Sequence, residues 1–152
     1  MDDRITSEAL MARYSMQKHV ENGAFVEKHY DYAGEGRAPS GSIYYYVAPD
    51  ELTEFHVIDC DEYWCYINGS PLDVWLVDAE GVTVRHLGIA DGCDPLVFVP
   101  RGTVFGSRHA SPCEEGTFLS CITVPRFDPD GFRLIQKDEM LREHPAVKDF
   151  YR

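Results

Sequence analysis

Residues 56–69 read "HVIDCDEYWCYING", a stretch in which histidine, glutamate and tryptophan fall two or more positions apart. Alternation along a β-strand places His56 and Ile58 on one face. The same even phase continues through Glu62, Trp64 and Tyr66. A core that needs only packing rarely combines an imidazole with a carboxyl, because burying either unpaired costs several kcal/mol. The stretch therefore predicts a polar-lined cavity inside a small β-barrel.

Short β-strands separated by turns are predicted from residue 42 onward. The connections leave no room for a helix at each crossover, which argues against an α/β fold and for an all-β sandwich or barrel. Asn68-Gly69 is a two-residue hairpin signal. The predicted strands are residues 42–48, 54–58, 62–67, 72–79, 82–89, 96–100, 103–110 and 117–124.

Both ends of the chain are expected to be helical. Residues 6–20 carry apolar side chains at helical spacing, with Thr6 or Ser7 as the N-cap. A short polar helix is expected around residues 137–142. The whole chain, residues 1–152, is expected to be one domain with a barrel core at about 24–127.

The overall charge limits the classes of partner. The chain has 152 residues, a formal net charge of −12 and a pI of about 4.8. This charge repels phosphate backbones and anionic lipids, so neither nucleic acid nor a membrane is an expected partner. No apolar run approaches a membrane span, and the acidic start is unlike a signal peptide. Five cysteines without a CxxC pair indicate reduced thiols in a cytoplasmic protein.

Several segments resemble the cupin superfamily. A histidine followed by Glu62-x6-Gly69 resembles the first cupin motif, and Pro100-Arg-Gly102 resembles the core of the second. The segments 16–30, 42–47, 61–69, 99–105 and 121–134 resemble, in order, those of the cupin_5 (DUF985) group. The resemblance implies a double-stranded β-helix, that is, a jelly-roll cupin barrel, usually dimeric, with a pocket inside. It implies no established reaction. A homodimer also suits exposed sheet edges.

The resemblance also bears on metal binding. Metal-binding cupins supply His-x-His, a glutamate and a later histidine. Here His56 and Glu62 fill two of these positions, whereas Ile58 and Phe105 stand where the other two histidines would be. The sequence therefore predicts no metal cofactor. The alternative is a divalent metal at His56 and Glu62 in a metal-dependent oxygenase or isomerase with atypical ligands.

The leading functional prediction is cofactor-free acid–base chemistry on a small molecule. His56 and Glu62 would exchange protons near neutral pH, and Tyr44 would supply a phenol. This arrangement suits an isomerase, epimerase, cyclase or lyase acting on a carbonyl or sugar-like substrate. The alternatives are a structural His56–Glu62 pair and a non-catalytic ligand-binding barrel. The predicted substrate-binding residues are Trp64, Tyr66, Tyr46, Phe105, Arg101, Glu21 and His19.

Overall fold

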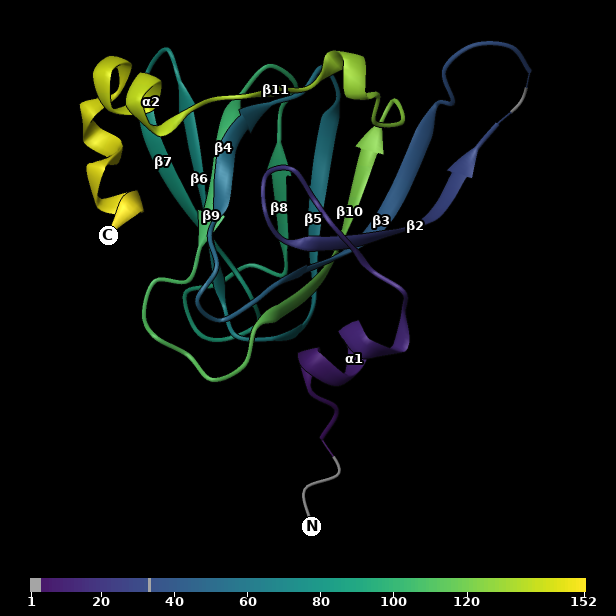
Figure 1. The fold of residues 1–152 in the computed structure, drawn as a ribbon, viewed down its shortest axis with the longest axis horizontal. Helices are drawn as coiled ribbons and strands as arrows, with labels where there is room; N and C mark the ends of the chain where they lie inside the picture. Colours follow the sequence, from purple (N-terminus) through teal and green to yellow (C-terminus); the bar gives the residue numbers. More distant parts are fainter. Residues whose placement is uncertain (1–3, 33) are drawn as a thin grey trace.

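Two antiparallel sheets form the protein. The computed structural model describes residues 4–32 and 34–152. The six-stranded sheet has the order β1 (Gln17–Lys18), β2 (Ala24–Asp31), β3 (Ser40–Val47), β10 (Thr117–Val124), β5 (Asp61–Gly69), β8 (Leu96–Val99). The five-stranded sheet has the order β11 (Arg133–Leu134), β4 (Thr53–Val57), β9 (Val104–Arg108), β6 (Leu72–Asp78), β7 (Gly81–Leu87) (Figure 1). The all-β prediction is confirmed.

Short helices occupy both ends of the chain. Helix α1 spans Ser7–Arg13, and the Thr6 side chain caps it by accepting a hydrogen bond from the Ala9 amide. The helix is shorter than predicted, because Tyr14 is extended and residues 17–18 pair with β2. The C-terminal elements are α2 (Lys137–Glu143) and the 3₁₀ helices η1 (Pro129–Gly131) and η2 (Pro145–Tyr151). None of the helices described within residues 4–32 and 34–152 is long and apolar enough to cross a membrane.

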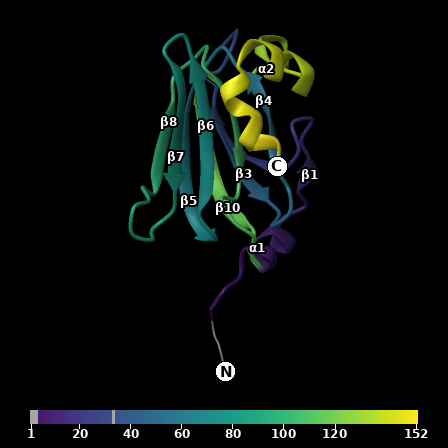
Figure 2. The same ribbon diagram turned by 90° about the vertical axis from the view of Figure 1, so that its left-hand side faces the viewer.

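Two apolar clusters hold the layers together. The larger cluster fills the space between the sheets and includes Leu72, Val74 and Leu119, all fully buried. The second joins the outer face of the five-stranded sheet to the C-terminal helices through Phe55 and Phe150, whose ring centroids are 4.3 Å apart. Figure 2 shows these helices lying against that sheet. Strand β4 is consequently buried on both faces, which fixes the side that His56 presents to the barrel interior.

The predicted hairpin at Asn68-Gly69 is wrong. Strand β5 belongs to the six-stranded sheet and β6 to the five-stranded sheet, so this turn is a corner between sheets. Gly69 has φ +102°, and a Cβ there would collide with the Gly116 carbonyl and the Ser7 hydroxyl. The Asn-Gly pair therefore serves a close backbone approach at the corner. The tight hairpin is β6–β7, where Asp78 pairs with Gly81.

Candidate functional site

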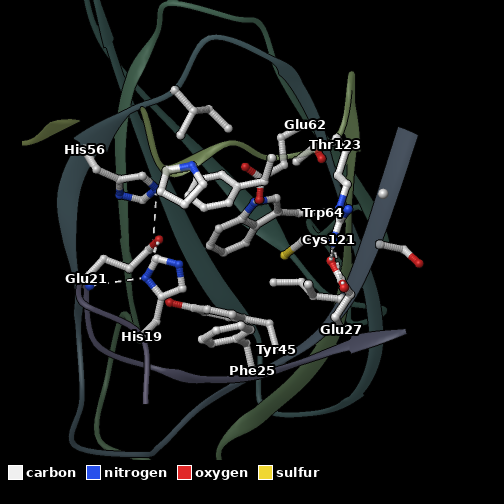
Figure 3. A pocket seen from close by; sticks show the side chains of 17 residues that line it. His19, Glu21, Phe25, Glu27, Tyr45, His56, Glu62, Trp64, Cys121 and Thr123 are labelled. Atoms are coloured by element: carbon white, nitrogen blue, oxygen red, sulfur yellow. Dashed lines mark hydrogen bonds and ion pairs between the residues drawn. The ribbon is translucent and has the colours of Figure 1, made fainter. Parts of the chain in front are cut away.

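A cavity of about 290 Å³ lies inside the barrel, between the two sheets. Figure 3 shows labelled side chains converging on it from both sides. The five-stranded sheet contributes His56 from β4, and the six-stranded sheet contributes Glu62 and Trp64 from β5. The remaining lining residues are His19, Glu21, Phe25, Glu27, Gly41, Ser42, Ile43, Tyr45, Ile58, Cys121, Thr123, Arg126, Phe127 and Pro129.

Five of the predicted site residues line this cavity: His56, Glu62, Trp64, Glu21 and His19. The even phase expected for residues 56–64 therefore matches the side chains that face the interior. The catalytic and binding roles given to these residues remain predictions.

Tyr44 and Tyr46 lie outside the cavity, contrary to the expectation for them. The β3 residues that line the cavity are Gly41, Ser42, Ile43 and Tyr45, so the tyrosine that faces inward is at an odd position. The Tyr44 ring instead packs 5.0 Å from the ring of Tyr14, and the Tyr46 hydroxyl donates to Glu8 at 2.8 Å. Even-numbered residues face the cavity on β4 and β5, but this does not determine which residues of β3 do so. The numbering of inward-facing residues is set separately for each strand by its pairing with its neighbours. The phenol inside the cavity is that of Tyr45, which donates to the Asn22 carbonyl at 2.6 Å.

Phe105, Tyr66 and Arg101 do not line the cavity either. Phe105 is fully buried, and its ring centroid lies 4.1 Å from that of His56. It therefore packs against the imidazole and does not line the cavity. Tyr66 packs against the central core and donates its hydroxyl to the Gly69 carbonyl. Arg101 is exposed and pairs with Asp61 at 3.4 Å. It lies in the turn between β8 and β9, so the substrate-binding role expected for it has no support from the cavity.

The protonation of His56 follows from its contacts. Its Nδ1 lies 2.7 Å from the Glu54 carbonyl, which can only accept, so Nδ1 carries the proton of the neutral ring. Its Nε2 is then unprotonated and carries a lone pair. This atom lies 3.2 Å from Glu21 Oε2. Burial lowers the pKa of His56 to about 4. A proton on Glu21 is therefore what makes the Nε2–Oε2 contact attractive.

Glu21 is suited to hold that proton. Burial, and then the charge of Glu62, raises the pKa of the Glu21 carboxyl well above its usual range. The β1–β2 turn fixes its position, because the Glu21 amide donates to His19 Nδ1 at 3.3 Å and its carbonyl accepts from the Glu54 amide at 2.7 Å. Figure 3 shows Glu21 between the two imidazoles. Glu21, rather than Glu62, is thus the carboxyl partner of His56.

Glu62 lies across the cavity from Glu21 and His56 (Figure 3). Its Oε1 accepts a hydrogen bond from the Trp64 indole at 2.7 Å. Burial raises the pKa of Glu62 to about 7, although hydrogen bonds from Trp64 and Cys121 oppose the rise. A carboxyl that titrates near neutral pH can both accept and return a proton under ordinary conditions. The site thus pairs two carboxyls on opposite sides, in place of the predicted His56–Glu62 couple.

The donor set does not fit the metal site of metal-binding cupins. Both nitrogens of His56 are engaged, one by a carbonyl and one by Glu21. Ile58 presents hydrocarbon to the cavity, and Phe105 packs on the imidazole. Across residues 4–32 and 34–152, no three His, Cys, Asp or Glu side chains converge as a set that could hold a metal ion.

Several lining residues were missed from the sequence, chiefly Tyr45, Phe25, Cys121, Thr123 and Phe127. Cys121 and Thr123 enter the site because β10 lies between β3 and β5 in the sheet. That pairing joins residues far apart in the chain, and no local pattern reports it. For β3, equal β-propensity of three consecutive tyrosines hid the phase.

Comparisons with known proteins agree with this architecture. The family Cupin_5, described as cupin superfamily (DUF985), matches residues 8–135. A protein from Shewanella oneidensis is 25% identical with a TM-score of 0.87, covering 96% of this chain and 94% of that one. A hypothetical protein from Leishmania major is 23% identical with a TM-score of 0.83, covering 93% and 94%. Oxalate decarboxylase from Bacillus subtilis shares the fold at 16% identity and a TM-score of 0.59, covering 90% of this chain and 35% of that one. No functionally curated sequence matches.

Proposed function

Since the chain belongs to the Cupin_5 family of the cupin superfamily, we propose that it binds a small molecule in the barrel cavity and catalyses proton transfer on it without a metal. The observation that supports this is the pair of buried carboxyls, Glu21 and Glu62, on opposite sides of the same cavity. A cavity of about 290 Å³ suits a molecule of roughly monosaccharide size.

The chemistry follows from the protonation of the two carboxyls. Glu62 in its ionised form takes a proton from a carbon beside a carbonyl group. Glu21, which carries a proton, delivers it to the opposite face of the carbon for epimerisation, or to the carbonyl oxygen to give an enediol. For isomerisation Glu62 then returns its proton to the former carbonyl carbon, and the neighbouring hydroxyl gives its proton back to Glu21. Before the reaction, the neutral His56 accepts a hydrogen bond from the protonated Glu21 and thereby stabilises the protonated form of Glu21. The step moves one proton on and one proton off, so it needs no oxidant or reductant.

The test is hydrogen exchange at carbon. A panel of small carbonyl compounds and sugars is incubated with the protein in D₂O, and loss of the C–H signal is followed by proton NMR. We expect exchange into at least one compound, lost on Glu62→Gln and on Glu21→Gln. Tyr44→Phe, which changes a phenol outside the cavity, is the matched control and should exchange at the wild-type rate. Exchange that survives both carboxyl variants would refute the proposal.

A non-catalytic binding barrel is the second candidate. It is favoured by the mainly apolar wall, formed by Phe25, Ile43, Ile58, Trp64 and Phe127. Native mass spectrometry of untagged protein separates the two. A retained small molecule that shows no exchange in D₂O supports binding alone, and one that does exchange supports catalysis.

We also propose a homodimer in the cytoplasm. Strand β8 is an edge of the six-stranded sheet. Leu96 and Phe98 on β8, with Tyr63 and Ile67 on the neighbouring β5, expose between 37% and 48% of their surface. A second copy of the chain, placed about a two-fold axis, would cover this edge with the same patch. All five cysteines are free thiols, which suits a reducing compartment.

A further inference from the structure

Aromatic rings surround much of the cavity. Trp64 and Tyr45 lie with ring centroids 5.8 Å apart, and Phe25 and Phe127 line the same space. The faces of such rings carry negative charge density and attract cations, most strongly where water is excluded. The wall is therefore apolar without being electrostatically neutral.

Among the described buried groups of the cavity, the one that supplies charge near neutral pH is Glu62, and that charge is negative. Glu21 and Glu62 are 6% and 8% exposed. Burial lowers the pKa of both imidazoles that line the cavity, His19 and His56, which favours their neutral forms. Among the described lining residues, the guanidinium belongs to Arg126 at the rim, where it pairs with Glu27 at 2.9 Å and lies 3.6 Å above the Tyr30 ring.

An anionic ligand would consequently meet the Glu62 carboxylate, the protonated Glu21 and no unpaired cation. Moving a carboxylate or phosphate into such a space would leave it without a charge partner, which is strongly unfavourable. A cation, in contrast, would be held by a carboxylate and by ring faces together. The net charge of −12 also draws cations toward the protein surface.

We propose that the molecule held in this cavity is a small organic cation, such as a protonated primary amine, bound between the aromatic rings and the Glu62 carboxylate. This inference rests on the proposed function and deepens it, because it gives the charge class of the substrate. An amine-bearing carbonyl compound, such as an amino sugar or an amino ketone, meets both requirements.

The binding of a cation at Glu62 is linked to pH. The ionisable groups that interact with Glu62 are Glu21 from the β1–β2 turn, Tyr45 from β3, Cys60 before β5 and Cys121 from β10. All of these are acids. The basic groups that line the same cavity are His19 and His56, whose pKa values burial lowers, and Arg126, which is paired with Glu27. If only the ionised form of Glu62 binds the cation, the competent fraction rises about tenfold between pH 6 and pH 8, because the pKa of Glu62 is about 7. Affinity should rise with it.

Three probes of one shape and different charge test the proposal. Benzylamine is cationic, benzyl alcohol is neutral and benzoate is anionic. The reporter is the indole N–H signal of Trp64, which donates to Glu62, in a proton–nitrogen NMR spectrum of the ¹⁵N-labelled protein. The chain has two tryptophans, so Trp75→Phe assigns the signal.

We expect benzylamine to bind about tenfold more tightly than benzyl alcohol at pH 8, and benzoate to leave the signal unmoved. Benzylamine affinity should fall about tenfold from pH 8 to pH 6, and Glu62→Gln should remove that dependence. The pH series on the wild-type chain decides the matter if the variant fails to fold. Three results would each overturn the proposal. Benzoate could bind as tightly as benzylamine, benzylamine and benzyl alcohol could bind equally tightly, or benzylamine could fail to bind at ten times the concentration at which benzyl alcohol half-saturates the site.

The failures of the two proposals are distinguishable. The probe series reports ligand charge whether or not any reaction occurs. Absence of carbon exchange in D₂O together with selective amine binding would sink the catalytic proposal and keep this one. Carbon exchange in neutral or anionic compounds, without preferential binding of amines, would support the catalytic proposal and contradict the cation proposal.

Discussion

Replacing Glu62 by glutamine should change how stability depends on pH, and by an amount that the site itself sets. The pKa of Glu62 is about 7 in the folded protein, because of burial, against 4.5 for an unperturbed glutamate. Between these two values the folded state binds more protons than the unfolded state. Stability is therefore fully present below pH 4.5 and declines as pH rises to 7. The loss amounts to about 3 kcal/mol.

His56 contributes with the opposite sign. Its pKa is lowered by burial from 6.5 to about 4, so the unfolded state binds the extra proton in that range and stability rises with pH. The wild-type profile is a sum in which the two effects partly cancel. The difference between the wild type and Glu62→Gln removes the His56 contribution, since both proteins share it. Glutamine also keeps an oxygen that can accept the Trp64 indole hydrogen bond.

Urea unfolding at pH 5 and pH 8 measures this difference. We expect Glu62→Gln to gain about 2.5 kcal/mol relative to the wild type on going from pH 5 to pH 8, because part of the titration lies below pH 5. Asp61→Asn is the matched control: hydrogen bonds from Arg101 lower the pKa of Asp61, so it stays ionised at both pH values and its difference should be constant. A Glu62→Gln difference that is also constant would show that Glu62 titrates as an ordinary surface carboxyl, and the acid–base account would fall with it.

Three further changes test the structure around the site. In urea unfolding, Tyr45→Phe should lose about 1–2 kcal/mol of stability, because the Asn22 carbonyl loses its hydrogen bond. Tyr44→Phe should change stability by less than about 0.5 kcal/mol. Equal effects of the two variants would contradict the placement of Tyr45, and not Tyr44, inside the barrel. Gly69→Ala should lower stability by about 2–4 kcal/mol, since its Cβ meets backbone at a left-handed position, and a neutral result in the same assay would contradict the corner geometry. If the proposed homodimer forms through β8, light scattering after size-exclusion chromatography should give a dimer mass for the wild type and a monomer mass for Phe98→Glu. A monomeric wild type, or an unchanged mass in the variant, would contradict this interface.

The barrel could be predicted from local pattern because its strands are short, alternate in hydrophobicity and are separated by turns. The face shared by His56, Ile58, Glu62 and Trp64 followed from the same alternation. The corner at Gly69 could not be recognised, since an Asn-Gly pair is compatible with a hairpin or with a close approach to another strand. Which alternative holds depends on β10 and α1, which lie far away in the sequence.

The pairing of the site's charges was the least accessible to sequence reasoning. Glu62 is near His56 in the chain, and this proximity suggested a couple. In the fold, however, the partner of His56 is Glu21. Glu21 lies in the β1–β2 turn, and the hydrogen bond from the Glu54 amide to the Glu21 carbonyl holds this turn beside β4. Proximity in sequence is a weak guide here, because the two strands carrying His56 and Glu62 belong to different sheets. Each protonation state then depends on burial that only the assembled barrel supplies.

The most direct test of the central claim is the metal content of active, untagged protein, measured on the sample that shows carbon exchange in D₂O. The account predicts far less than one metal ion per chain and an exchange rate unchanged by a chelator. One tightly held divalent metal per chain, with exchange that stops on its removal and returns when it is restored, would contradict it.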